Sequence, residues 1–264
     1  MLTAVKNQIK VSFLSTRYAL EREMLNKVTF ITNIIFMILN NSCFIVQWII
    51  LYSIKDNIGG LGFKELLLLW GLAAGTFGFA RFFCESAFNI SDAINKGTLD
   101  NYLVQPKNVL LSYITSTVQV SCLGDMLYAY IMLFIYGITV KSFILFTFFC
   151  INGALIVVAL AIIFGSLSFW FGRVELVADT MNSLMVNFAT YPDGIFKGIV
   201  KILFYTIIPL EFVNYIPIRL IIDFNLNSFI IVIAVTIFFI SLAFIIFYQG
   251  LKRYSSSNLM NVRI

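Results

Sequence analysis

The sequence predicts an all-α polytopic membrane protein, and three observations lead to that fold class. Hydrophobic residues occupy 60% of the 264 positions and charged residues only 12%, which is about half the charged share of a soluble domain. The charges are unevenly spread, because residues 28–54, 142–172 and 226–251 carry none. About 20 apolar residues suffice to cross the hydrocarbon core of a bilayer, so each of these runs is long enough to span it.

The same counts argue against other classes of protein. A soluble protein, a nucleic-acid-binding protein and a disulfide-stapled secreted domain are all disfavoured by this composition. The chain has no histidine, which removes the commonest general base and the commonest zinc ligand. Its four cysteines lie apart in apolar stretches, so we expect them to pack as small hydrophobic side chains and to bind no metal.

Residues 1–27 are expected to form an N-terminal amphipathic helix that lies in the membrane interface. They lack the apolar core and small-residue cleavage site of a signal peptide. Charged residues recur along one stripe at helical spacing and apolar residues along another, a pattern typical of an interfacial helix. The charged stripe comprises Lys6, Lys10, Arg17 and Glu21, and the apolar stripe comprises Leu2, Ile9, Phe13 and Leu20.

The remaining residues, 28–264, are expected to form a six-span domain. Apolar runs predict spans at residues 28–53, 66–84, 109–138, 142–170 and 229–248. A polar loop at residues 86–108 separates the second span from the third. Residues 191–225 are apolar but interrupted by charges and by Pro209 and Pro217, which is typical of re-entrant helices. The residues leave two places for the fifth span, 175–187 or 199–216, and both give six spans with the two termini on one side.

Basic residues near the span ends predict that both termini are cytosolic. We expect the protein to lie in the cell (inner) membrane. This orientation places twelve basic residues inside and six outside, and a fifth span at 199–216 would sharpen the bias. The six outer residues are Lys55, Lys64, Lys141, Lys197, Lys201 and Arg219. The twelve inner residues are Lys6, Lys10, Arg17, Arg22, Lys27, Arg81, Lys96, Lys107, Arg173, Lys252, Arg253 and Arg263.

Motifs for catalysis are absent from the sequence. No glycine precedes a lysine, so the chain has no phosphate-binding loop of the G-x-x-x-x-G-K type, and it has no G-x-S-x-G or H-E-x-x-H motif. Energy for transport would come from an ion gradient or from a separate ATPase. Asp125, near the middle of the third predicted span, is the candidate for an ion-coupled secondary transporter. Its alternative role is a structural polar contact, and a membrane-embedded enzyme is the least favoured class.

The stretch between the second and third spans is too apolar for a plain surface loop. Ile90, Ile94 and Leu99 follow an amphipathic pattern that reaches Gly97, and a second short segment stops at Pro106. A short, partly apolar helix just below the membrane is what a transporter needs to dock on a cytosolic motor.

Three runs of sequence resemble one transporter class. Residues 96–106, Lys-Gly-Thr-Leu-Asp-Asn-Tyr-Leu-Val-Gln-Pro, resemble the G-T-L-[DE]-x-x-L-x-x-P stretch of type-2 ATP-binding-cassette (ABC) permeases. Residues 168–173, Ser-Phe-Trp-Phe-Gly-Arg, are similar to a run in the branch of uncharacterised ABC transport-system permeases. So are residues 189–192, Ala-Thr-Tyr-Pro, with residues 208–217, Ile-Pro-Leu-Glu-Phe-Val-Asn-Tyr-Ile-Pro. With the span layout, the resemblance covers essentially the whole chain.

The resemblance implies a non-catalytic permease subunit of an ATP-driven exporter. Such permeases work as homodimers or heterodimers among membrane lipids, with two cytosolic ATPase subunits that bind the ATP and Mg²⁺, so no cofactor is expected in this chain. The resemblance also favours a fifth span at residues 175–190, followed by re-entrant helices on the outer side in residues 191–225.

By position, the resemblance assigns two sets of site residues. Residues 90–100 would insert into a groove of the ATPase, although Asp92 and Asn95 stand where many relatives are more acidic. The predicted ATPase-coupling residues are Ile90, Asp92, Ile94, Gly97, Thr98, Leu99 and Asp100. The predicted outer gate consists of Tyr191, Pro192, Pro209 and Pro217.

Overall fold

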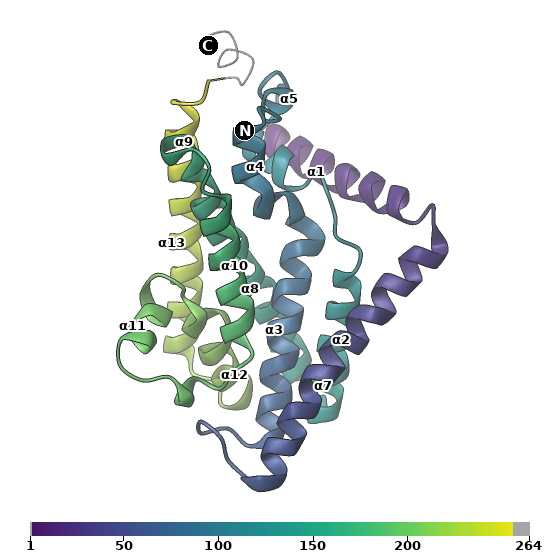
Figure 1. The fold of residues 1–264 in the computed structure, drawn as a ribbon, viewed down its shortest axis with the longest axis vertical. Coiled ribbons are helices and arrows are strands. Elements are labelled where there is room, and N and C mark those ends of the chain that lie inside the picture. Colours follow the sequence, from purple (N-terminus) through teal and green to yellow (C-terminus); the bar gives the residue numbers. More distant parts are fainter. Residues whose placement is uncertain (1, 256–264) are drawn as a thin grey trace.

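The computed structural model describes residues 2–255, and every regular element in that range is a helix (Figure 1). The one pairing of the β type is an isolated bridge between Ile58 and Leu61 in a turn. Four helical stretches in this range are long and apolar enough to cross a membrane, and a bent helix pair is a fifth candidate. The expected all-α membrane fold is therefore confirmed. The expected position of Arg263 lies outside the described residues.

The first two candidate spans form as expected. α2 (Lys27–Ile54) begins after Asn26, whose side-chain oxygen accepts a hydrogen bond from the backbone nitrogen of Thr29. α3 (Phe63–Cys84) continues through the 3₁₀ helix η1 (Glu85–Asn89) into α4 (Ile90–Asn95). This second stretch is therefore longer than the predicted 66–84.

The predicted continuous third span at residues 109–138 is wrong. The chain forms α6 (Val109–Ile114), leaves the helix, and resumes in α7 (Cys122–Gly137). The intervening residues 115–121 read Thr-Ser-Thr-Val-Gln-Val-Ser, and hydroxyl and β-branched side chains favour a helix less than Leu or Ala does. The Ser86 hydroxyl lies 2.9 Å from the Ser116 hydroxyl and 2.6 Å from that of Thr117, which holds the break against η1.

The core forms around α3, which packs against α7 and α8 (Val140–Ser166). Glycines on α3 permit this approach: a Cβ on Gly71 would lie 2.8 Å from Met132 Cβ, and a Cβ on Gly75 would lie 2.6 Å from Cys150 Sγ. In a lipid environment such close packing replaces the hydrophobic effect as a source of helix association. α13 (Leu226–Leu251), the last candidate span, lies against α8.

The segment after α8 contains several short helices. α9 (Ser168–Phe171) ends at Gly172, and α10 (Glu175–Ala189) follows, so a helix forms where the fifth span was preferred. Then come η2 (Asp193–Ile195), α11 (Ile199–Thr206), the π-helix η3 (Glu211–Tyr215) and α12 (Ile216–Ile222). α11 and the η3–α12 stretch are bent by 70° to each other, so no straight helix occupies residues 199–216.

The two ends of the bundle carry different elements (Figure 1). α4, α5 (Asp100–Leu103), α9 and the end of α13 lie at one end, and α1 (Leu2–Glu23) runs across the bundle there. The turn between α2 and α3 and the helix α11 lie toward the opposite end. We call the first the α4 end and the second the α11 end.

Candidate coupling surface and outer gate

The segment that follows α4 reverses direction at Gly97. Its φ of +72° lies in the left-handed region that favours glycine. The backbone nitrogen of Gly97 donates to the carbonyl of Ile94, and that of Thr98 donates to the carbonyl of Ala93, at 3.3 and 3.1 Å. This is the Schellman arrangement that commonly ends a helix. Gly97 is therefore required by the backbone, which explains its place in the predicted coupling set.

The apolar side chains of the predicted coupling set are buried inside the protein and do not point toward the surface. Ile90 and Leu99 are fully buried and Ile94 nearly so. A Cβ built on Gly165 of α8 would lie 3.0 Å from Ile90 Cβ, so α4 packs tightly against α8. These three side chains hold the segment in place from inside.

The polar members of the set form the outer surface of the segment. Lys96 Nζ donates to Asp92 Oδ2 at 2.7 Å, and this exposed pair lies one helical turn apart. That hydrogen bond raises the pKa of Lys96 above its ordinary value. Thr98 is exposed and Asp100 is partly exposed. A partner at the α4 end would therefore meet charged and hydroxyl groups.

A groove of about 540 Å³ runs along α4 between α9 and the end of α13. On one side Asn95 Nδ2 donates to Glu175 Oε1 at 2.9 Å, and the Ser91 and Ser168 hydroxyls are also hydrogen-bonded. The sequence offered no signal for these contacts, which join residues about 80 positions apart. The charged residues that line the groove are Asp92, Lys96, Arg173, Glu175 and Arg253.

At the α11 end, Tyr191 packs against α2 and Pro192 packs against the turn between α2 and α3. The Tyr191 ring lies edge-on to Trp48 of α2 with centroids 5.5 Å apart. Pro192 is buried, and a Cβ on Gly59 would lie 2.8 Å from its Cβ. The turn between α2 and α3 therefore packs directly on this part of the predicted gate.

The other two predicted gate residues shape the bend and the helix after it. Pro209 lies between α11 and η3, and its carbonyl accepts from the backbone nitrogen of Val213 at 3.1 Å. Pro217 lies in the first turn of α12. Because a proline has no N–H to donate to the residue four positions earlier, the π-helical turn of η3 immediately before it is accommodated.

An ion-pair network missed by the sequence reasoning holds this end together. Arg219 of α12 donates to Glu211 Oε1 at 3.1 Å and also pairs with Asp193. The Glu211 side chain is only 2% exposed, whereas that of Arg219 is 55% exposed. The signal was available in the charges within residues 191–225, but nothing in their spacing indicated which would pair.

Asp125 does not lie in the middle of a continuous span, because the third span is broken. It lies in the first turn of α7, is 8% exposed, and accepts a hydrogen bond of 2.6 Å from Asn41 Nδ2 of α2. Beside it, a Cβ on Gly124 would lie 2.5 Å from the carbonyl oxygen of Ile34. The structural contact, one of the two expected roles of Asp125, is therefore observed, between α2 and α7.

A polar recess of about 200 Å³ lies between α3 and α10. Arg81 lines it, donates to Glu85 Oε1 at 3.2 Å, and lies 4.3 Å above the Phe88 ring. Asn182 lines it from α10, and its buried Oδ1 has no hydrogen-bond partner among the described residues. Polar groups of this kind are costly in a membrane and commonly line a pathway or an interface.

Of three comparisons with known proteins, one found a match. The comparison with curated proteins found no match, and neither did the comparison with solved structures. The family model described as ABC-2 family transporter protein matches residues 24–258, which include all the candidate spans and the segment after α4. With its apolar helices, this match makes the chain a multi-pass membrane protein that belongs to the ABC-2 family of transporter proteins.

Proposed function

We propose that the chain is the transmembrane permease subunit of an ATP-driven ABC exporter. ABC-2 permeases are membrane transport components that normally work with ABC ATPase subunits. In this proposal the ATP and Mg²⁺ are bound by two cytosolic ATPase subunits, and two permease chains form the pathway as a homodimer or heterodimer. The α4 end docks on the ATPases, through the exposed Asp92, Lys96 and Thr98, with Asp100 at the edge.

The proposed topology has six spans. They are α2, α3, the broken pair α6–α7, α8, α10 and α13, while α11, η3 and α12 form re-entrant helices on the outer side. α1 lies in the cytosolic interface, and both termini are cytosolic in the cell (inner) membrane. The distribution of basic residues supports this orientation. The α11 end carries only the six lysines and arginines assigned to the outside, fewer than the twelve assigned to the inside. The bend of 70° also suits a re-entrant pair.

The observation that carries the dimer and the pathway is a polar stripe on α10. Asp179, Ser183 and Asn187 recur every four residues and are all exposed, so they lie on one face of the helix. Lipid is a poor neighbour for such a face, and polar residues within spans usually face a bundle interior or water. The recess at Arg81 lies beside the same helix. A second permease chain across a water-filled pathway would give both the polar face of α10 and the recess at Arg81 a polar neighbour.

Co-purification tests the proposal most simply. The chain is expressed with candidate ABC ATPase subunits, purified through a tag on the chain, and analysed by native mass spectrometry. We expect a complex of two permease chains and two ATPases that hydrolyses ATP. A stable permease that transports without any bound ATPase would overturn the proposal.

The pathway has its own test. In a Cys43→Ser background, Ser183→Cys should react with a water-soluble maleimide at a rate that changes when ATP is added. Ala234→Cys on the exposed face of α13 is the control and should stay unreactive, since it faces lipid. Equal reactivity at the two positions would argue against a pathway along α10.

A further inference from the structure

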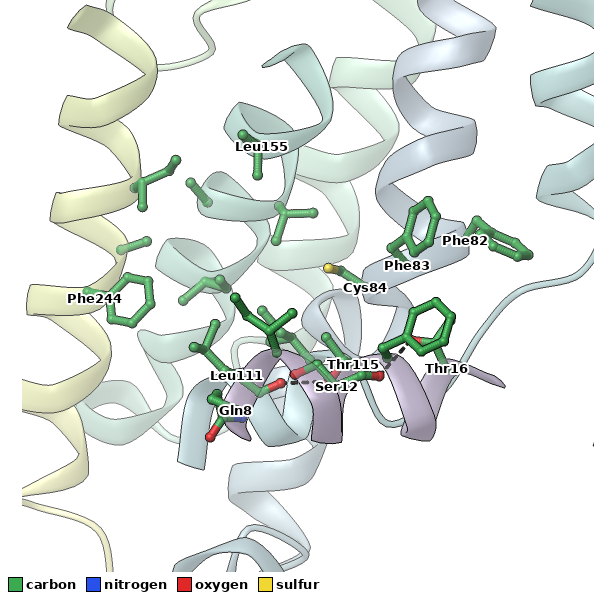
Figure 2. Close-up of a pocket in the computed structure, with 18 of the residues that line it drawn as sticks. Gln8, Ser12, Thr16, Phe82, Phe83, Cys84, Leu111, Thr115, Leu155 and Phe244 are labelled. Atoms are coloured by element: carbon green, nitrogen blue, oxygen red, sulfur yellow. Dashed lines mark hydrogen bonds between the residues drawn. The ribbon is translucent and has the colours of Figure 1, made fainter. Parts of the chain in front are cut away.

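One cavity in the described part of the chain lies outside the elements assigned to coupling and to the pathway. It measures about 660 Å³ and lies between α1, α6, α8 and α13 (Figure 2). Its size is within the range of about 300–1,000 Å³ typical of ligand sites. The helix α6 ends at Ile114, which lines the cavity together with Leu111 and Thr115.

The cavity has an apolar wall, and the helix α1, at the bottom in Figure 2, closes one side of it. Leu111, Leu155, Ala159, Ala243 and Phe244 are among the side chains of the wall. On α1, Thr16 Oγ1 donates to the carbonyl of Ser12 at 3.1 Å.

Gln8 joins α1 to α6 through hydrogen bonds. Its side chain donates to Ser112 Oγ at 3.3 Å and accepts from the backbone nitrogen of Asn108 at 3.1 Å. Because these polar atoms are satisfied, the cavity offers its occupant apolar contacts and few hydrogen bonds. It therefore suits a hydrocarbon chain.

A second recess of about 570 Å³ adjoins the cavity and shares Gln8, Ile9 and Leu111 with it. Lys107 lines this recess, and no carboxylate in residues 2–255 forms an ion pair with it. Arg17, on the cavity itself, is instead paired with Glu21 at 2.8 Å. The helix α1 adds a net positive charge, with four basic and two acidic residues. An apolar cavity thus opens beside an uncompensated cation.

We propose that this cavity holds one acyl chain of an anionic glycerophospholipid, whose phosphate lies at Lys107. The lipid comes from the leaflet in which α1 lies, and the exposed Ile9 and Phe13 of α1 contact the surrounding lipid. The acyl chain would fill the cavity and contact α1, α8 and α13 at the same time. This inference needs only the membrane location and is independent of the ATPase partner.

Photo-crosslinking in lipid nanodiscs tests the acyl-chain site. The full chain is reconstituted in phosphatidylcholine containing phosphatidylglycerol with a diazirine on one acyl chain, and adducts are mapped by peptide mass spectrometry. We expect adducts to concentrate in residues 155–162 and 240–244. Ala243→Phe, which fills the cavity, should lower that yield about tenfold if the bound chain loses some 1.4 kcal/mol. Ala234→Phe, on the exposed face of the same helix, should leave it unchanged.

A second variant guards against a folding failure of Ala243→Phe. Leu155 lines the cavity but is 45% exposed, so Leu155→Trp should fold and still lower the yield. Adducts spread evenly over the exposed faces of α2 and α13, or a yield unaffected by both variants, would overturn the site.

The headgroup is tested by competition between lipids. A basic residue near a membrane surface favours anionic lipid by about fivefold, so Lys107→Ala should lower the preference for phosphatidylglycerol over phosphatidylcholine by about that factor. Lys141→Ala, at the α11 end, is the matched control. Equal labelling of the wild type by both lipids, or displacement by free fatty acid but not by phosphatidylglycerol, would overturn the assignment of an anionic phospholipid.

Discussion

The side-chain nitrogen of Asn95 donates a hydrogen bond of 2.9 Å to Oε1 of Glu175. Asn95 ends α4 and Glu175 begins α10, so the bond joins the proposed ATPase-docking segment to the helix with the polar stripe. The helix α10 thus combines a connection to α4 with an exposed row of polar residues. Under the proposed function, this bond is one route by which movement at the ATPases would reach the pathway.

Removing this bond should weaken coupling. Glu175→Ala in the purified complex should lower the ATP-dependent change in Ser183→Cys labelling about fivefold, since a hydrogen bond contributes about 1 kcal/mol. Asn95→Ala should have the same effect, and the double variant should be no worse than either single one. Asp56→Ala, also acidic but exposed in the turn between α2 and α3, should leave the ATP-dependent change intact. Additive effects of the two substitutions would contradict a shared role.

Gly97 should be required for coupling beyond its effect on stability. Gly97→Ala forces a side chain into the left-handed region, which costs about 1–2 kcal/mol. Gly60 also has a positive φ, of +88°, but lies in the turn at the α11 end, so Gly60→Ala is the matched control. Thermal unfolding in detergent should show similar losses for both. Only Gly97→Ala should change the ATP hydrolysis of the complex, and an equal change in Gly60→Ala would contradict this.

Arg219 should stabilise the α11 end. Arg219→Met leaves the buried Glu211 without its partner, which costs about 3–5 kcal/mol in a fully buried pair. Because half of Arg219 is exposed, we expect about 2 kcal/mol, measured as a fall in the unfolding temperature. Adding Glu211→Gln should restore much of the loss, because it removes the unpaired charge. Lys197→Met, an exposed neighbour, should have little effect, and a similar fall there would point to a general effect of charge.

Asp125 should act through its hydrogen bond and not through its charge. Asp125→Asn keeps an acceptor for Asn41, so stability and ATP hydrolysis should stay near wild type. Asp125→Leu should destabilise the chain by about 0.6–1.7 kcal/mol, the range for hydrogen bonds between membrane helices. If Asp125→Asn abolished transport and left stability unchanged, an ion-coupled mechanism would gain support over the present one.

The sequence predicted the helices better than their breaks. Hydropathy located α2, α8 and α13 to within a few residues, because long uncharged runs have few alternatives in a bilayer. It missed the break at residues 115–121, since Ser, Thr and Val are apolar enough to pass as part of a span. The break is held in place by contacts of Ser116 and Thr117 with Ser86, about 30 positions away, which hydropathy does not register.

The sequence predicted the helical segment around Ile90 and Ile94 but not the surface that these side chains contact. The pattern of Ile90, Ile94 and Leu99 indicated an amphipathic segment, yet apolar periodicity does not say which surface covers it. In the structure the chain covers these residues itself. The contacts of Asn95, Gln8 and Arg219 depend on helix packing between distant segments, so they could be found only in the fold.

Site-specific photo-crosslinking within the assembled complex tests the central claim, that the α4 end docks on an ATPase. A benzoylphenylalanine residue is placed at the exposed Thr98, and in a separate sample at Lys64 at the start of α3, on the opposite end. The present account predicts a crosslink to the ATPase from Thr98 and none from Lys64. A crosslink from Lys64, or its absence at Thr98 in a complex that retains the ATPase, would contradict it.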